Sequence, residues 1–176
     1  MSSFVCTRCG KPHEGVPTFG FRFPIDYLDV PEPEREARVF LTEDTCVIDD
    51  ERFYVRGCLE IPVDGACSPF IWGVWVAVSE DAFFQFQNLL GVDVRSQHGP
   101  FEGQLSSPPR PYPDSTNLRV VVRLRDHGIR PLVEIEDRGH PLAVEQKDGI
   151  SQQRVAEIAE LMRPGARRAA EQGDDE

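Results

Sequence analysis

Two cysteines and a histidine near the start of the chain have the residue types and spacing of a metal site. Cys6 and Cys9 are separated by two residues, Gly10 follows, and His13 lies four residues beyond Cys9. Structural zinc takes four tetrahedral sulfur or nitrogen ligands, and a Cys-x-x-Cys pair supplies two of them from a single turn. We therefore expect residues 4–13 to form a knuckle that binds zinc through Cys6, Cys9 and His13.

The fourth ligand has to come from one of the three other cysteines. Cys46 is the preferred candidate, followed by Cys58 and then Cys67. The zinc would be structural, because no general base lies nearby in the sequence. Two alternatives remain open, namely two thiols in a tight turn and a redox pair. Gly10 and Pro12 speak against the redox pair, because redox cysteines normally open a helix.

A second group, Arg56, Glu60, Trp75 and His140, is a possible binding cleft. Arg56 and Glu60 share the polar face of one expected strand, and Trp75 belongs to the next strand. The plainer interpretation is that the two charges form structural ion pairs, which are commoner than functional ones. Trp72 and Trp75 are an odd number of residues apart, so they face opposite sides of the sheet, and core packing is the default for both.

A third group combines His140 with Glu134, Glu136 and Glu145. Carboxylates near a histidine serve acid–base chemistry or bind a divalent metal. However, Glu134 and Glu136 alternate with apolar residues, which is typical of an ordinary solvent-facing strand surface. The sequence contains no glycine-rich phosphate loop, nucleophile elbow or paired-histidine metalloprotease motif. No catalytic residue is therefore predicted.

The elements that must position these residues centre on two apolar runs, 53–63 and 70–78. The first run alternates apolar and polar residues with the period of a half-buried strand. The second run is apolar on both faces, as in a strand covered on both sides. Asp64-Gly65 and Ser68-Pro69 between the runs supply turn residues, so the two strands are predicted to form a hairpin.

The remaining elements are shorter. Arg119 and Arg123 could pair with Glu134 and Glu136 if their strands are antiparallel neighbours. Ser79 and Ser151 are expected N-caps, and Gly91 is expected to end the helix that Ser79 opens. The expected strands are 101–105, 118–124, 131–136 and 142–145, and the expected helices lie near 31–40, 79–90 and 151–162.

Together these elements predict a single α+β domain over residues 1–163. It has a mostly antiparallel sheet, two to three short helices and the N-terminal Cys/His knuckle. Residues 164–176, which are rich in charged and small residues, are expected to be a disordered tail.

The formal net charge of −11 limits the kinds of partner. It argues against nucleic acid, which is bound through clustered Lys and Arg, and against anionic membrane surfaces. A basic protein partner would be attracted, although the plainer interpretation is that most proteins this acidic are simply soluble. The N-terminus lacks the basic and apolar regions of a secretory signal, and no run is long enough to cross a bilayer, so a cytoplasmic location is expected. The oligomeric state stays open.

Five stretches of the sequence together carry a family resemblance: FVCTRCGKPHEG, DTCVID, FYVRGCLEIPV, FIWGVWVAVSEDAF and RPLVEIEDRGHPLAVEQKDGIS. The chain resembles, over residues 4–162, the uncharacterised bacterial family called domain of unknown function 2199. The resemblance implies one domain and an intracellular bacterial protein. It implies no reaction, substrate or cofactor.

Two functional hypotheses follow from the sequence. The first is a non-enzymatic binding or regulatory module with a structural zinc site, and its motives are the acidic charge and the absence of a catalytic motif. The alternative is a small metal-dependent hydrolase, in which water fills an open zinc position near Arg56, Glu60 or His140.

Overall fold

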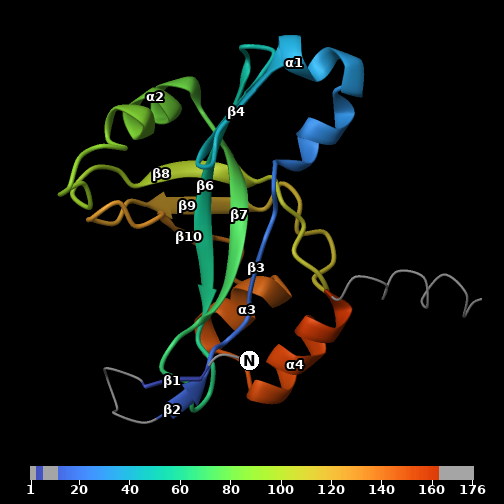
Figure 1. Ribbon diagram of the computed structural model, residues 1–176, viewed down its shortest axis with the longest axis vertical. Coiled ribbons are helices and arrows are strands. Elements are labelled where there is room, and N and C mark those ends of the chain that lie inside the picture. The colour runs from blue at the N-terminus through green and yellow to red at the C-terminus, as the bar shows by residue number, and fades with distance from the viewer. Residues whose placement is uncertain (1–2, 6–11, 163–176) are drawn as a thin grey trace, which may run out of the picture.

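The fold is known from a computed structural model that describes residues 3–5 and 12–162. Its main sheet has eight strands in the order β3-β7-β8-β9-β10-β6-β5-β4, and a separate two-stranded sheet pairs β1 with β2. β6 also pairs with β7, so β6 to β10 close into a five-stranded barrel (Figure 1). The strands are β1 Ser3–Val5, β2 Pro12–Glu14, β3 Thr18–Gly20, β4 Val39–Leu41, β5 Thr45–Ile48, β6 Arg52–Ile61, β7 Phe70–Val78, β8 Phe101–Leu105, β9 Arg119–Arg123 and β10 Leu132–Ile135.

The predicted central hairpin is confirmed. β6 and β7 pair antiparallel, from Phe53 opposite Val78 to Ile61 opposite Phe70. Strand side chains alternate between faces, so every second residue of β6 points into the barrel and the residues between them point outward. Val55 and Leu59 are buried inward residues, whereas Arg56 is only partly buried and faces outward.

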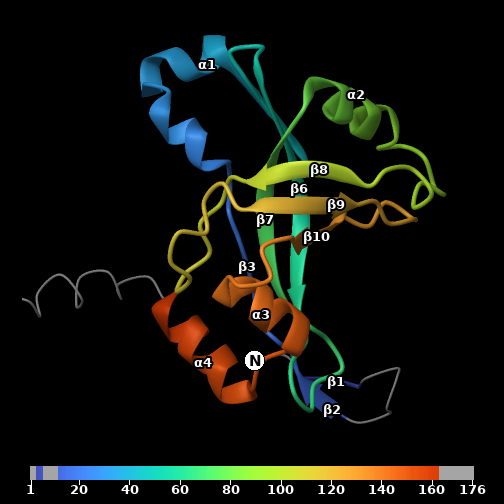
Figure 2. The same ribbon diagram turned by 180° about the vertical axis from the view of Figure 1, so that it is seen from behind.

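Helices cover the two ends of the barrel (Figures 1 and 2). At one end α2 inserts Phe83 against Phe53 of β6, with the ring centroids 5.2 Å apart. At the other end α3 and α4 contribute buried Leu142 and Ile158 to the same core. The helices are α1 Arg35–Arg38, α2 Glu80–Asn88, α3 Pro141–Asp148 and α4 Gln152–Leu161, with short 3-10 turns at η1 Ile25–Asp29 and η2 Glu32–Glu34.

Two glycines allow the strands to approach closely where the barrel curves. A Cβ at Gly57 would lie 2.5 Å from Cγ2 of Val133 on β10. A Cβ at Gly103 would lie 2.6 Å from the carbonyl oxygen of Ala77 on β7. Glycine inside a strand commonly marks such a close backbone approach. Both positions therefore require the absence of a side chain.

A second, smaller core covers the outer face of the sheet over β5 and the adjoining parts of β6 and β7. Cys46, Tyr54 and Trp75 are fully or almost fully buried there, together with Val30 and Ile48. Asp26 of η1 anchors the covering segment, because its carboxylate accepts a hydrogen bond of 2.7 Å from the hydroxyl of Ser106. Trp72 belongs to the barrel core instead. The prediction that Trp72 and Trp75 face opposite sides is confirmed.

Two of the expected helices are confirmed by their caps. The hydroxyls of Ser79 and Ser151 accept hydrogen bonds from the N–H groups of Ala82 and Arg154, at 3.2 and 3.1 Å. The expected role of Gly91 is wrong, because α2 ends at Asn88.

Two other predictions fail for local reasons. The predicted strand over 142–145 is a helix, α3, which begins at Pro141 because the His140 ring caps it by accepting from Leu142 N. The expected helix over 31–40 is reduced to the turn η2 and four residues of α1, since the chain enters β4 at Val39.

The predicted α+β class and mostly antiparallel sheet are confirmed, and the described residues contain four α-helices rather than two to three. Cys6 and Cys9 of the expected knuckle and the expected tail 164–176 lie outside the described residues. Within the described part of the chain, no helix combines the length and apolar character needed to cross a lipid bilayer.

Candidate functional site

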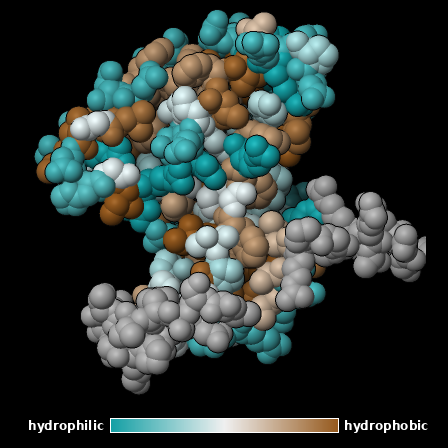
Figure 3. All heavy atoms as spheres, viewed as in Figure 1, coloured by the Kyte–Doolittle hydropathy of each residue, from teal (hydrophilic) through white to brown (hydrophobic). Residues whose placement is uncertain are grey.

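An arginine cluster lies on the outer face of the barrel, over the middle of β6. Arg56 and Trp75 are register partners on β6 and β7, so their side chains share this face. The guanidinium carbon of Arg56 lies 5.7 Å from the centroid of the Trp75 ring, which is within cation–π range. Figure 3 views the molecule from this side and shows hydrophilic residues gathered across the middle of the face.

Two glycines form the floor beneath Arg56. Gly20 of β3 and Gly73 of β7 are register partners in the parallel β3–β7 pair. A Cβ at Gly20 would lie 3.1 Å from Nη2 of Arg56, and a Cβ at Gly73 would lie 3.7 Å from it. The bare backbone of two neighbouring strands therefore makes room for the guanidinium group.

Two further arginines reach this face from the β9–β10 loop. Arg125 Nη1 contacts Glu60 Oε1 at 2.5 Å, and Arg130 Nε contacts Asp44 Oδ1 at 2.6 Å. Arg95 holds this loop in place. It is 2 % exposed, and its Nε donates a hydrogen bond of 2.8 Å to the carbonyl oxygen of Arg125. We call the set Arg56, Arg125, Arg130, Asp44 and Glu60 the arginine site.

The electrostatics of the arginine site leave Arg56 without an ion pair of its own. Burial lowers the pKa of Arg56 from its ordinary value, and the neighbouring positive charge of Arg130 lowers it further. The Cys58 thiol, on the same strand, has a pKa raised by burial, so it stays protonated near neutral pH. The site is therefore a cationic surface without a thiolate nucleophile.

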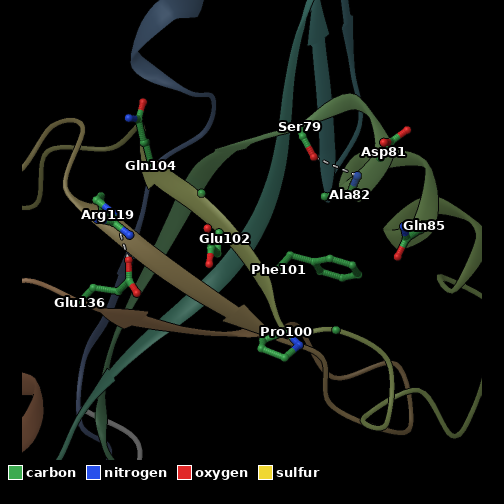
Figure 4. A pocket seen from close by; sticks show the side chains of 12 residues that line it. Ser79, Asp81, Ala82, Gln85, Pro100, Phe101, Glu102, Gln104, Arg119 and Glu136 are labelled. Atoms are coloured by element: carbon green, nitrogen blue, oxygen red, sulfur yellow. Dashed lines mark hydrogen bonds and ion pairs between the residues drawn. The ribbon is translucent and has the colours of Figure 1, made fainter.

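A second candidate is a groove between α2 and the strands β8 and β9, shown in Figure 4. Its volume is about 770 Å³. Glu102 projects from β8 between the Arg119–Glu136 pair and the first turn of α2. Asp81 lines the α2 side, and the almost fully buried ring of Phe101 lies in the groove wall.

Carboxylates dominate the charge of this groove. Glu102, Asp81 and Glu136 are opposed by Arg119 alone among the residues that line it. Arg119 is already paired with Glu136, with 3.3 Å between Nε and Oε2. We call this feature the acidic groove. Its chemistry suits a cationic side chain whose aliphatic part can lie along the exposed Pro100.

Cys46, the preferred fourth zinc ligand, is buried in the second core between β4 and β6. Burial raises the pKa of its thiol to about 12. A zinc ligand must be a thiolate, so this environment opposes metal binding. Cys46 therefore behaves as a small apolar core residue.

Cys46 and His13 belong to strands at opposite ends of the β6–β7 hairpin. In Figure 1 the β1–β2 sheet, which contains His13, lies at the opposite end of the long β6–β7 hairpin from β4. β4 carries Leu41, the register partner of Cys46. The fold does not bring Cys46 and His13 together.

Cys67 lies at the same end as His13. Thr18 and Ile71 are partners in the parallel β3–β7 pair, so the segments that precede them enter the sheet at the same end of the strands. His13 lies five residues before Thr18, and Cys67 lies four residues before Ile71. Of the three cysteines considered as fourth ligands, Cys67 is the one that the topology directs towards His13.

His140 lies apart from Arg56, Glu60 and Trp75. Both nitrogens of its ring have structural partners, since Nε2–H donates to Pro113 O at 2.7 Å and Nδ1 accepts from Leu142 N at 3.1 Å. The ring partners of His140 therefore come from α3 and from the loop that precedes β9, and none of them is Arg56, Glu60 or Trp75.

The carboxylates of the third group have separate partners. Glu134 pairs with Arg123 and Glu136 with Arg119, as the strand pattern predicts, and Glu145 pairs with Arg154. In the part of the chain that the structure describes, no group of three or more His, Cys, Asp or Glu residues is arranged to hold a metal ion.

The sequence reasoning missed part of each site. Arg125, Arg130, Gly20 and Gly73 reach Arg56 only through long-range strand pairing, and no local pattern in the sequence identifies them. Glu102 could have been noticed as a charged residue on the solvent face of the short strand 101–105.

The comparison with protein families gives one match. The model of the family described as uncharacterized proteins conserved in bacteria, DUF2199, matches residues 5–150, and the chain belongs to this family. Neither the curated proteins nor the solved structures with which the chain was compared include a match.

Proposed function

We propose that this member of the DUF2199 family is a non-enzymatic binding module that holds basic side chains of a protein partner in the acidic groove. The observation that carries the proposal is that Asp81, Glu102 and Glu136 line one groove, opposed by a single arginine. The net charge of −11 supports it, because a strongly acidic protein attracts basic partners over a distance.

The groove offers both contacts that a lysine or arginine side chain requires. Glu102 is exposed and supplies a carboxylate, and Pro100, which is also exposed and lines the groove, supplies apolar contact for the methylene groups. Asp81 also stabilises the first turn of α2, so its carboxylate has a structural role as well. Glu102 is the residue on which binding depends most.

The test is the affinity of the full chain for a fluorescent peptide of alternating lysine and serine, measured by fluorescence anisotropy at low salt. Glu102→Gln should weaken binding several-fold, and Asp81→Asn should weaken it further when combined with it. Glu32→Gln, which removes one exposed carboxylate that belongs to the short turn η2 and does not line the groove, is the matched control. An equal loss of affinity in both Gln variants would reduce the effect to net charge and contradict the proposal.

We also propose a structural zinc knuckle formed by Cys6, Cys9, His13 and Cys67. The register of β3 with β7 supports Cys67 in place of Cys46. The burial and raised pKa of Cys46 support the same exchange. The zinc would join the N-terminal segment to the β6–β7 turn and so fix β3, which supplies Gly20.

Elemental analysis of protein purified without chelators or a histidine tag tests the knuckle. The proposal requires one zinc per chain in the wild type. Cys67→Ser should release the metal and lower the unfolding midpoint, because binding energy is folding energy in structural sites. Cys46→Ser, the matched control, should retain it. Protein without zinc, or zinc loss in Cys46→Ser alone, would contradict this assignment.

A further inference from the structure

Arg56 has no carboxylate partner within the arginine site. Glu60 is bound by Arg125 and Asp44 by Arg130, so both carboxylates are engaged by other guanidinium groups. The hydrogen bond that the structure gives Arg56 is a long one, 3.4 Å from Nη1 to the carbonyl oxygen of Glu43. Three cations therefore share two paired carboxylates on this face.

The Nε atom of Arg56 is buried and has no hydrogen-bond partner in the structure. Burying a polar group without a partner is unfavourable, and each such group in a folded protein requires an explanation. The neighbouring Arg130 adds repulsion, while the side chains of Asp44 and Glu43 provide partial compensation from further away. A bound anion would supply both the missing acceptor and the missing charge.

The shape of the surroundings leaves room for such an anion. Gly20 is exposed and Gly73 is partly exposed, so the floor beside the guanidinium is open to solvent. Arginine presents its N–H groups as a planar fork that matches two oxygens of a carboxylate or phosphate. Because Nε is buried, the guanidinium would have to turn towards the open side of the face for Nε and one Nη to reach the same oxyanion.

We propose that Arg56, lying over Gly20 and Gly73, is the receptor for an oxyanion, a carboxylate or a phosphate, carried by a ligand of this protein. Arg125 and Arg130 act as positioning residues, because they engage Glu60 and Asp44 and so keep these carboxylates from neutralising Arg56. This site is separate from the acidic groove. β6 and β7 face the viewer in Figure 1, whereas β8 and β9 lie in front after the half-turn of Figure 2.

The test follows the Nε–Hε signals of the arginines in the ¹⁵N-labelled full chain by NMR. Sodium phosphate and sodium acetate are titrated separately, with chloride holding the ionic strength constant. The Arg56 signal should shift and saturate with at least one of the two anions, and the arm that saturates identifies the oxyanion. A shift that stays linear, or that chloride reproduces, would overturn the proposal.

Variants connect the signal to the geometry. Arg56→Lys keeps the charge and loses the fork, and it should weaken binding about tenfold or more, a change followed through the amide signals of Gly73 and Trp75. Arg123→Gln, in an exposed pair on β9, is the control and should bind as the wild type does. Gly20→Ala, on the short edge strand β3, should displace the guanidinium and weaken binding even if Arg56→Lys fails to fold. Unchanged affinity in folded Arg56→Lys, or in Gly20→Ala when its Arg56 Nε–Hε signal has moved, would refute the site.

Discussion

Replacing Gly57 by alanine tests how the barrel closes between β6 and β10. The new Cβ would lie 2.5 Å from Val133 Cγ2 and 3.0 Å from the carbonyl oxygen of Pro131. Val133 is fully buried, and the Pro131 oxygen accepts a hydrogen bond of 2.8 Å from Cys58 N. Neither neighbour can move away without losing packing or a hydrogen bond.

The magnitude follows from three opposing effects. Overpacking by one methyl group costs about 1–3 kcal/mol. Weakening the Cys58–Pro131 hydrogen bond adds about 1 kcal/mol. Alanine restricts the unfolded chain and offsets about 0.4–1 kcal/mol. The expected loss is roughly 1–3.6 kcal/mol, which corresponds to a fall in Tm of about 2–14 °C for a chain of this length.

Urea unfolding of Gly57→Ala, Val133→Ala and the double variant provides the assay. Removing the Val133 methyl groups relieves the contact, so the double variant should lose less stability than the sum of the single variants, by about 0.5–3 kcal/mol. Gly91→Ala is the control, because a Cβ there meets no atom within 4 Å. Its stability should stay within about 0.5 kcal/mol of the wild type. A harmless Gly57→Ala, or additive losses, would refute the reasoning.

Three further predictions concern charge, burial and capping. Hydrogen bonds from Arg38 and then Arg52 lower the pKa of Asp49 to about 2. The stabilisation by the ion pairs of Asp49 with Arg38 and Arg52 is therefore complete above the ordinary carboxyl pKa of about 4, and it is lost as the pH falls through about 2. As the pH falls from about 4 to about 2, the wild type should lose its stability advantage over Asp49→Asn. Stability curves of the two proteins that stay parallel over this pH range would contradict the prediction. Cys46, fully buried and with a pKa raised to about 12, should react with iodoacetamide at pH 8 far more slowly than half-buried Cys58. Peptide mass mapping measures both rates, and equal rates would refute the burial argument. Ser79→Ala should cost about 1 kcal/mol in urea unfolding whereas Ser79→Asp should retain most of the stability. Equal losses would show that capping is not the cause.

Local patterns in the sequence predicted the parts of the fold that depend on nearby residues. The alternation in 53–63 fixed which side chains of β6 point inward, and the serine caps marked two helix starts. The cross-strand pairs of Arg119 with Glu136 and Arg123 with Glu134 also followed from alternation, and both are present.

Long-range pairing and unusual capping were not predictable in this way. His140 caps α3 with a ring nitrogen, a role that serine, threonine, aspartate and asparagine usually take. The parallel pairs β3–β7 and β10–β6 join segments distant in the sequence. They bring Gly20 to Arg56 and exclude Cys46 from the neighbourhood of His13. The sequence could therefore name Arg56 and Glu60 but could not supply the surroundings that leave Arg56 without an ion pair among the described residues.

The central proposal is that the acidic groove binds basic side chains of a partner. Its most direct measurement is an amide chemical-shift map of the ¹⁵N-labelled full chain titrated with the lysine–serine peptide at low salt. The account predicts that the largest shifts lie at Gln85, Glu102 and Gln104, which line the groove. An absence of shifts, or shifts confined to other surfaces, would contradict it.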